Sequence, residues 1–222
     1  LAYYGARAAE YDQWWLRQGR YNRGAEETAR WFREAAELDA ALDAFQPAGD
    51  ILELACGTGL RSGKLLAAAD RLTVVDGSAE MLAIHAERFG AAPVERIQAD
   101  LFDWSPPRRF DVVYFGFWLS HVPPDRFAEF WVLVERALKP DGRFFFVDSR
   151  RTPDSTAVDH VLPDEGTSTM IRRLDDGREF RVFKVFYDPR ELEMRLAELA
   201  WDCQVGETGT YFIHGHGARR AS

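Results

Sequence analysis

The feature that most constrains the fold is an apolar segment that runs directly into a glycine turn. Residues 51–60 read Ile-Leu-Glu-Leu-Ala-Cys-Gly-Thr-Gly-Leu, and helix-forming residues follow them. The apolar half is typical of a buried strand, and Gly57 and Gly59 have no Cβ, so the backbone can turn sharply and approach a ligand. This order of strand, glycine loop and helix predicts a small-molecule site at the end of a sheet strand.

The glycine spacing separates this loop from two other nucleotide-binding loops. A dinucleotide fingerprint requires Gly-x-Gly-x-x-Gly, but the sixth position is Ser62 and the next glycine is Gly63. A phosphate-binding P-loop ends in Gly-Lys followed by Ser or Thr, whereas Gly63-Lys64 is followed by Leu65. The pattern Glu-x-x-Cys-Gly-x-Gly at 53–59 instead resembles motif I of the class I S-adenosylmethionine (SAM) dependent methyltransferases.

Four later segments resemble the same family in the same order. An apolar run at 72–75 ends in Asp76-Gly77-Ser78, and a short strand pattern at 94–101 ends near Asp100. A fourth strand pattern covers 110–117, and 138–147 matches the family's helix, turn and fifth strand. Gly57, Asp76, Asp100 and Phe117 all fall at strand ends, where ligands of open α/β sheets bind.

The resemblance implies SAM as the cofactor and S-adenosylhomocysteine (SAH) as the product. It implies that Asp76 holds the ribose hydroxyls, that Asp100 accepts from the adenine amine, and that Glu53 organises the glycine loop or the methionine ammonium. Asp76 has an alternative role as a helix cap, which Ser78 fills equally well. The alternative for Asp100 is a turn acid, and for Glu53 a buried, paired acid of purely structural value. The remaining cofactor-binding residues predicted here are Tyr11, Arg20, Tyr21, Gly57, Gly59, Gly77, Ser78, Met81, Leu101 and Phe117.

The order of patterns predicts a single α/β domain of the doubly wound, Rossmann-like kind, with an inserted β-hairpin. An aromatic-rich N-terminal helical lid is expected at 1–46, a SAM-binding core at 48–149, and the hairpin and C-terminal strands at 150–222. The resemblance implies a seven-stranded sheet of order 3-2-1-4-5-7-6, whose last strand in the chain is antiparallel. Strands are predicted near 50–54, 72–76, 94–98, 110–116, 143–148, 201–206 and 210–215, and helices near 60–69, 79–89, 124–138 and 189–199.

Composition narrows the classes of partner. A net charge of −8 and a pI near 5.2 disfavour nucleic acid, because neutralising phosphates requires a basic surface. The chain has no apolar run of the length that a membrane span needs. Two cysteines make no disulfide framework, which favours a cytoplasmic location. Whether two chains pair as a homodimer stays open.

The catalytic candidate is His121, in the segment Phe117-Trp118-Leu119-Ser120-His121 that leaves the fourth strand. In similar enzymes the methyl acceptor lies here, so the imidazole is placed to take a proton from it. Its alternative role is to cap the next helix or to satisfy loop carbonyls. Trp118 is expected to form a wall of the acceptor pocket, and Trp15 to reach that pocket from the lid.

A hairpin is predicted around Leu174-Asp175-Asp176-Gly177-Arg178, with Asp176-Gly177 as a two-residue loop. That register places Arg172 directly opposite Arg181, which is unfavourable unless an anion lies between them. Glu179 is one candidate for that anion. The other is a carboxylate or phosphate on the acceptor, held by Arg172 and Arg181.

The sequence also separates reaction types. Methyltransferases that act on nucleic-acid amines carry Asp/Asn-Pro-Pro-Tyr/Phe in the fourth motif, whereas this chain has Tyr114-Phe115-Gly116-Phe117. His214 and His216 are two histidines without a third ligand, so no metal is predicted. The predicted function is methyl transfer from SAM to an oxygen or nitrogen of a small molecule. A protein or RNA methyltransferase and a non-catalytic SAM-binding regulator remain as alternatives.

Overall fold

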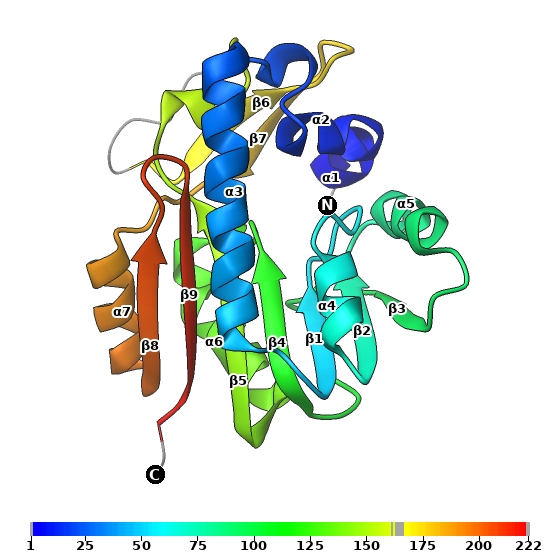
Figure 1. Cartoon of the computed structure of the whole chain (residues 1–222), viewed down its shortest axis with the longest axis vertical. Coiled ribbons are helices and arrows are strands. Elements are labelled where there is room, and N and C mark those ends of the chain that lie inside the picture. The colour runs from blue at the N-terminus through cyan, green and yellow to red at the C-terminus, as the bar shows by residue number, and fades with distance from the viewer. Residues whose placement is uncertain (1, 161, 163–166, 221–222) are drawn as a thin grey trace.

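A seven-stranded sheet forms the centre of the computed structural model, which describes residues 2–160, 162 and 167–220 (Figure 1). The sheet has the order β3-β2-β1-β4-β5-β9-β8, and β9 is antiparallel to both of its neighbours. Counted within the sheet, this is the predicted order 3-2-1-4-5-7-6 with an antiparallel seventh strand, so that prediction is confirmed. The strands are β1 (Asp50–Leu54), β2 (Arg71–Asp76), β3 (Val94–Gln98), β4 (Phe110–Gly116), β5 (Leu138–Ser149), β8 (Trp201–Glu207) and β9 (Phe212–Arg219).

Helices cover both faces of the sheet, and alternate residues of each strand pack into two separate hydrophobic cores. Ile51 packs on the face covered by α3 (Ala25–Phe45), while Leu52 and Leu54 pack on the face covered by α6 (Phe127–Ala137). This alternation follows from the two-residue period of a strand. The first face also carries α4 (Ser62–Ala68) and α5 (Ala79–Phe89), and the second face carries α7 (Pro189–Glu198).

Aromatic side chains fill much of both cores. Trp31 of α3 is fully buried and its ring lies 4.6 Å from that of Phe212. On the other face, Trp131 of α6 lies 4.9 Å from Phe144 and 5.3 Å from Trp201. The two faces are therefore tied to the C-terminal strands, which fixes the far edge of the sheet.

The N-terminal segment lies above the carboxyl ends of the strands, together with the hairpin (Figure 1). It consists of α1 (Ala2–Arg7), η1 (Ala8–Glu10), α2 (Tyr11–Trp15) and η2 (Gly19–Tyr21), and from here on the word lid means these elements alone. The remaining helix of the segment predicted at 1–46, α3, packs on the face of the sheet. Helices this short are not stable alone, so tertiary contacts must hold them. Trp14 Nε1 donates to the carbonyl of Ser155 at 2.7 Å and Arg17 donates to the carbonyl of Asp154 at 2.6 Å. These contacts tie the lid to the segment around η5 (Pro153–Ser155).

The hairpin exists, but its predicted register is wrong by one residue. In β6 (Thr169–Arg173) and β7 (Glu179–Phe183), Arg172 pairs with Phe180 and Ile171 pairs with Arg181. The loop holds three residues, because the Leu174 amide bonds to the Arg178 carbonyl and Gly177 adopts a φ of 86°. A turn closed by a left-handed glycine is the common three-residue hairpin loop, and the extra residue puts Arg172 and Arg181 on opposite faces.

Several element boundaries also differ from those predicted. The strand expected at 143–148 begins at Leu138, and the one expected at 210–215 is β9, which runs from Phe212 to Arg219. The helix expected at 124–138 is divided into η4 (Pro124–Arg126) and α6. The chain enters η4 from extended backbone at Pro123, because proline at 124 disfavours helical backbone in the residue before it. No helix in the described part of the chain has the length and hydropathy that crossing a bilayer requires.

Candidate active site

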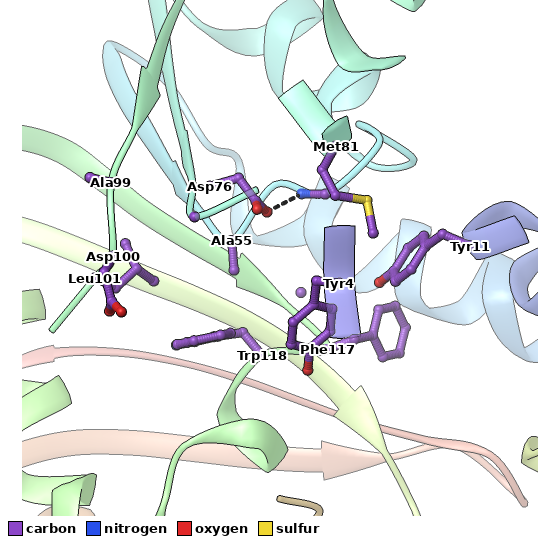
Figure 2. Close-up of a pocket in the computed structure, with 13 residues that line it drawn as sticks. Tyr4, Tyr11, Ala55, Asp76, Met81, Ala99, Asp100, Leu101, Phe117 and Trp118 are labelled. Atoms are coloured by element: carbon purple, nitrogen blue, oxygen red, sulfur yellow. Dashed lines mark hydrogen bonds between the residues drawn. The ribbon is translucent and has the colours of Figure 1, made fainter. Parts of the chain in front are cut away.

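Two neighbouring cavities lie at the carboxyl ends of the strands, beneath the lid. The first is bounded on one side by Tyr4 and Tyr11 of the lid (Figure 2). Its other walls come from the ends of β1, β2, β3 and β4, where the parallel strands all point. The lining residues are Tyr4, Tyr11, Ala55, Gly57, Asp76, Gly77, Met81, Ala99, Asp100, Leu101, Gly116, Phe117 and Trp118.

Asp76 joins the glycine loop to the end of β2. Its Oδ2 accepts from the Gly57 amide at 2.8 Å, and its Oδ1 accepts from the Ser78 amide at 2.8 Å. Burial raises the pKa of Asp76, although these backbone hydrogen bonds oppose the rise. The helix-cap role belongs to Ser78, whose Oγ accepts from the Met81 amide at 3.2 Å. Asp76 is therefore left to organise the loop and to present its carboxylate to the first cavity.

The backbone at two corners of the cavity is strained. Ala55 after β1 has a φ of 52° and Phe117 after β4 has a φ of 55°, a region that non-glycine residues rarely occupy. Such strain persists only where the surrounding structure holds it, and it is common at ligand sites. Both residues line the first cavity, so the strain is located where the chain turns toward a ligand.

The second cavity shares Tyr4, Tyr11 and Phe117 with the first. A molecule in it would lie against whatever the first cavity holds. Its polar and charged lining comes from the lid, from the end of β5 and from the hairpin. The complete set is Tyr4, Arg7, Tyr11, Trp14, Phe117, His121, Ser149, Ser155, Thr156, Leu162, Arg172, Lys184 and Phe186.

Three cationic side chains converge on the second cavity. Lys184 Nζ donates to Ser120 Oγ at 2.7 Å and lies 3.4 Å from Asp148 Oδ1, and both residues of that ion pair are buried. Arg172 Nη1 donates to Thr156 Oγ1 at 2.5 Å. Arg7 is enclosed by tyrosine rings, with Tyr11 nearest at 4.8 Å.

The charges in this cavity are not balanced by the residues around them. Among the described residues, Asp148 is the carboxylate that pairs with Lys184, and neither Arg7 nor Arg172 has an acidic partner within ion-pair distance. Burial lowers the pKa of Arg172, and the nearby charge of Arg7 lowers it further. Charge without a partner is costly where it is shielded from water, so this cluster is suited to an anionic ligand.

His121 lies in the second cavity with a defined tautomer. Its Nδ1 is 2.6 Å from the carbonyl oxygen of Phe183, which can only accept, so Nδ1 carries the proton and Nε2 carries the lone pair. Burial lowers the pKa of His121 well below its ordinary value, and the charges of Lys184 and Arg172 add to that effect. The imidazole is therefore a neutral hydrogen-bond acceptor and a weak base.

Several residues predicted to bind the cofactor or the acceptor lie outside both cavities. Glu53, Gly59 and Ser78 are behind the first cavity, where they support the glycine loop. In the lid, Trp15 packs against Trp31 and Phe117, Tyr21 accepts from Arg7, and Arg20 forms ion pairs with Asp159 and Asp175.

Arg181 lies on the outer face of the hairpin, in a separate surface groove with Ile171. Its predicted partnership with Arg172 is therefore wrong, and only Arg172 reaches the second cavity. The predicted histidine pair on β9, His214 and His216, stacks against the ring of Phe145.

Other residues of the second cavity were missed from the sequence. Tyr4, Arg7 and Trp14 belong to short lid helices, and Lys184 and Phe186 follow the hairpin, where no motif marks them. Arg7 offered a weak signal, as a cation within a run of aromatic residues. A further set was missed without any signal: Ser149, Ser155, Thr156 and Leu162.

Comparison with known proteins agrees with this geometry. A methyltransferase domain model matches residues 51–142, which contain the glycine loop and the ends of β2, β3 and β4. Uncharacterized methyltransferases of Mycobacterium tuberculosis and Mycobacterium bovis are 34% identical over 93 residues, which cover 40% of this chain. The match spans 47% of the length of those curated relatives.

Two solved structures resemble nearly the whole chain. The complex of DhpI with SAH is 38% identical, with a TM-score of 0.78, and the match covers 100% of this chain and 95% of that one. The complex of DhpI with SAM and HEP is 40% identical, with a TM-score of 0.80, and the match covers 98% and 94%. The fold, the glycine loop and these matches together define a Rossmann-like methyltransferase. The chain belongs to the class I SAM-dependent methyltransferases, and SAM is the cofactor of that family.

Proposed function

We propose that this protein transfers the methyl group of SAM to an oxygen of a small acidic molecule, releasing SAH. SAM occupies the first cavity, where Asp76 and Asp100 stand at the ends of neighbouring strands. The acceptor occupies the second cavity, with its negative charge on Arg7, Arg172 and Lys184. The observation that carries the proposal is this group of cations, of which Arg7 and Lys184 are buried and Arg172 is half-buried, beside the cofactor cavity.

The charge of the cluster favours a doubly charged acceptor. Three cations face one buried carboxylate, Asp148. Counted over the described residues, this cluster therefore has an excess of two positive charges. A phosphonate or a phosphate monoester supplies two negative charges on one compact head group, whereas a carboxylate supplies one. Arginine also binds such oxyanions through two parallel N–H donors. We therefore propose a phosphonate or phosphate head group.

An oxyanion acceptor also suits the weak base in the site. An ionised oxygen needs no proton removed before it attacks the methyl group, and the sulfonium of SAM is already an activated donor. Nε2 of His121 carries no proton and so has no proton to remove here, and placing oxygen, methyl and sulfur in line supplies much of the rate. Trp118 and Phe117 separate the reacting atoms from water.

Two further observations support a small acceptor. The lid and the hairpin cover the second cavity, which leaves little room for a protein or RNA chain. DhpI has been solved with SAM and HEP together, so a protein 40% identical to this one holds a second molecule beside SAM.

A cytoplasmic location and a homodimer remain predictions from the sequence.

The test is methyl transfer from radiolabelled SAM to a panel of short alkyl phosphonates, phosphate monoesters, carboxylates, phenols and amines. The phosphonates and phosphates are expected to be the best acceptors. Replacing Arg172 by Ala is expected to raise the acceptor KM about 100-fold, since a half-buried charged partner is lost. The dissociation constant of SAM should change less than about threefold, because Arg172 lines only the second cavity.

Arg181→Ala is the matched control, since Arg181 lies on the same hairpin but faces away from the cavity. It should leave the acceptor KM unchanged. Turnover of neutral phenols or amines with no turnover of any anionic acceptor would contradict the proposal. An unchanged KM for an anionic acceptor in Arg172→Ala would contradict the assigned site.

A further inference from the structure

A chain of four buried or half-buried polar side chains lies behind the glycine loop and takes no part in either cavity. Arg96 Nε on β3 is 3.0 Å from His85 Nδ1, and His85 Nε2 is 3.1 Å from Ser62 Oγ. Ser62 Oγ is in turn 2.5 Å from Glu53 Oε2 on β1. His85 and Ser62 are fully buried, and Glu53 is 2% exposed. The residues come from four elements, β3, α5, α4 and β1, which converge under the loop.

The direction of every hydrogen bond in this chain is determined by its first member. A guanidinium can only donate, so His85 Nδ1 accepts and the ring proton is on Nε2. His85 Nε2 therefore donates to Ser62, and the Ser62 hydroxyl donates to Glu53. We call Arg96, His85 and Ser62 the relay. It ends on Glu53 as an acceptor and so stabilises the ionised carboxylate.

The relay acts against the surroundings of Glu53. Burial raises the pKa of Glu53 to about 8, the nearby charge of Asp76 adds to the rise, and Ser62 and Arg61 oppose it. Arg61 is itself paired with Asp39 at 2.8 Å. The other titratable groups that act on this region are Cys56 on the loop, Tyr114 on β4 and His85 on α5. Glu53 is thus poised to change charge near neutral pH.

The relay also touches the loop that builds the cofactor cavity. A Cβ on Gly59 would lie 2.7 Å from His85 Cδ2, so the imidazole packs directly on the loop. Asp76, whose charge acts on Glu53, lines the cavity and bonds the Gly57 amide. A change of charge at Glu53 therefore acts on the first cavity through Asp76, which lines it.

We propose that Arg96, His85 and Ser62 position Glu53 as an internal counter-ion for the sulfonium cofactor, so that the protein prefers SAM to SAH. SAM carries a sulfonium charge that SAH lacks, while both carry the same ammonium and carboxylate. A cation entering the first cavity favours the ionised form of Glu53. Binding of SAM therefore releases a proton from Glu53, whereas binding of SAH releases little. The preference concerns the cofactor cavity alone and is independent of the acceptor in the second cavity.

The experiment is calorimetric titration with SAM and with SAH from pH 6 to pH 8.5, in two buffers of different ionisation enthalpy. In wild type, SAM binding is expected to release up to about one proton per site below pH 8, and the ratio of SAM to SAH affinity should rise with pH. The comparison with Glu53→Gln is the deciding one, because the sulfonium lowers the pKa of the ammonium in SAM and that ionisation contributes equally to both proteins. Glu53→Gln should release fewer protons than wild type on binding SAM, and its ratio should change less with pH.

Ser62→Ala separates positioning from a merely structural role. Loss of the hydroxyl is expected to lower the SAM to SAH ratio about tenfold at pH 7, since a hydrogen bond to a charged group is lost. The ratio should rise toward the wild-type value only above pH 8.5, because without this hydrogen bond the pKa of Glu53 lies higher than in wild type. Thr73→Val is the matched control, because Thr73 Oγ1 also donates to a carboxylate, Glu95, but lies outside the relay. It should behave as wild type.

Two results would overturn the proposal. One is the absence of proton release on SAM binding to wild type, with a ratio that is flat across pH. The other is a loss in Ser62→Ala that is equal for SAM and SAH at every pH, which would indicate structural damage only. If Ser62→Ala does not fold, wild type and Glu53→Gln still decide the outcome. Failure to methylate any phosphonate or phosphate would leave these binding results unaffected.

Discussion

Lys184 differs from the two arginines of the second cavity, because it has a carboxylate partner and can lose its charge. Burial lowers the pKa of Lys184 to about 8, while Asp148 opposes that effect. Lys184 is hence charged at neutral pH and becomes neutral slightly above it. Arginine keeps its charge throughout this range. One cation of the cluster is therefore sensitive to pH, and two are not.

This difference predicts an alkaline limit on acceptor use. Below pH 8 Lys184 is protonated in the protein without acceptor and attracts the anion. As the pH rises through 8, Lys184 loses its proton. Above pH 8, kcat/KM for the acceptor should therefore fall about tenfold per pH unit. The measurement is kcat/KM from pH 6.5 to 10 at saturating SAM. Lys184→Arg should move this limb upward, because the replacement stays charged. An unmoved limb in Lys184→Arg would assign the titration to another group.

At the scale of elements, the glycine loop depends on two properties of Gly59. Its φ of 84° is left-handed, and a Cβ there would lie 2.6 Å from Phe89 Cε2 and 2.7 Å from His85 Cδ2. A residue with a side chain would thus meet both backbone strain and a clash with α5. The loop and the helix that follows β2 can approach each other only because this position is glycine.

Gly59→Ala is expected to lower the melting temperature by about 5 °C or more and to weaken SAM binding at least about tenfold. The strain and the clash both move the loop away from Asp76. Gly177→Ala is the control, since Gly177 has a similar φ of 86° but a Cβ there would meet no atom within 4 Å. Thermal melts and SAM titrations of both variants check this. Equal effects of the two substitutions would show that the clash with α5 is unimportant.

The lid is held to the hairpin by one arginine with several partners. Arg20 pairs with Asp159 at 3.0 Å and with Asp175 at 2.8 Å, and it donates to the carbonyl of Arg173 at 2.6 Å. Asp175 also accepts from Gln13 at 3.1 Å. These residues are partly exposed, so each pair contributes little, but together they join the two parts of the cover over the second cavity.

Arg20→Ala is therefore expected to loosen the cover without disturbing the sheet. The acceptor KM should rise about fivefold, which corresponds to roughly 1 kcal/mol for a partly exposed set of ion pairs. Amide hydrogen exchange in residues 2–21 should become faster, while exchange in β1 and β4 stays unchanged. Arg173→Ala is the control, because that side chain pairs with Glu179 inside the hairpin. Unchanged exchange in the lid would exclude this latch.

At the scale of the whole molecule, the sheet and the cofactor cavity were predictable, and the second cavity was not. Asp76, Asp100 and Phe117 follow apolar strand patterns, and parallel strands bring their carboxyl ends to one edge of the sheet. The second cavity joins the lid, the end of β5 and the hairpin, which are distant in sequence and carry no motif. The Arg172 prediction reached a cavity residue through a register that is wrong by one, because loop length is decided by backbone geometry.

The two cavities together also make a prediction about product release. Before transfer, SAM has a net charge of +1 and a phosphonate or phosphate acceptor has −2; afterwards SAH is neutral and the methyl ester has −1. The total is unchanged, but the second cavity, with its excess of two positive charges among the described residues, loses half of its balancing charge. The first cavity loses the sulfonium at the same time. After transfer, the charges of SAH and the methyl ester therefore balance the charges of the two cavities less well than the charges of SAM and the acceptor did.

The methyl ester is accordingly expected to bind the SAH complex about 30-fold more weakly than the unmethylated acceptor, as loss of one buried charge pair costs a few kcal/mol, partly offset by the added methyl group. Calorimetry with each ligand on the SAH-bound protein measures this directly. For Arg172→Ala, which removes one excess charge, the difference between acceptor and ester should narrow. Equal affinity for acceptor and ester in the wild-type protein would mean that the charge excess does not select the dianion. A second methyl transfer onto the ester should also be slow, because the monoanion leaves one cation of the cavity without a partner.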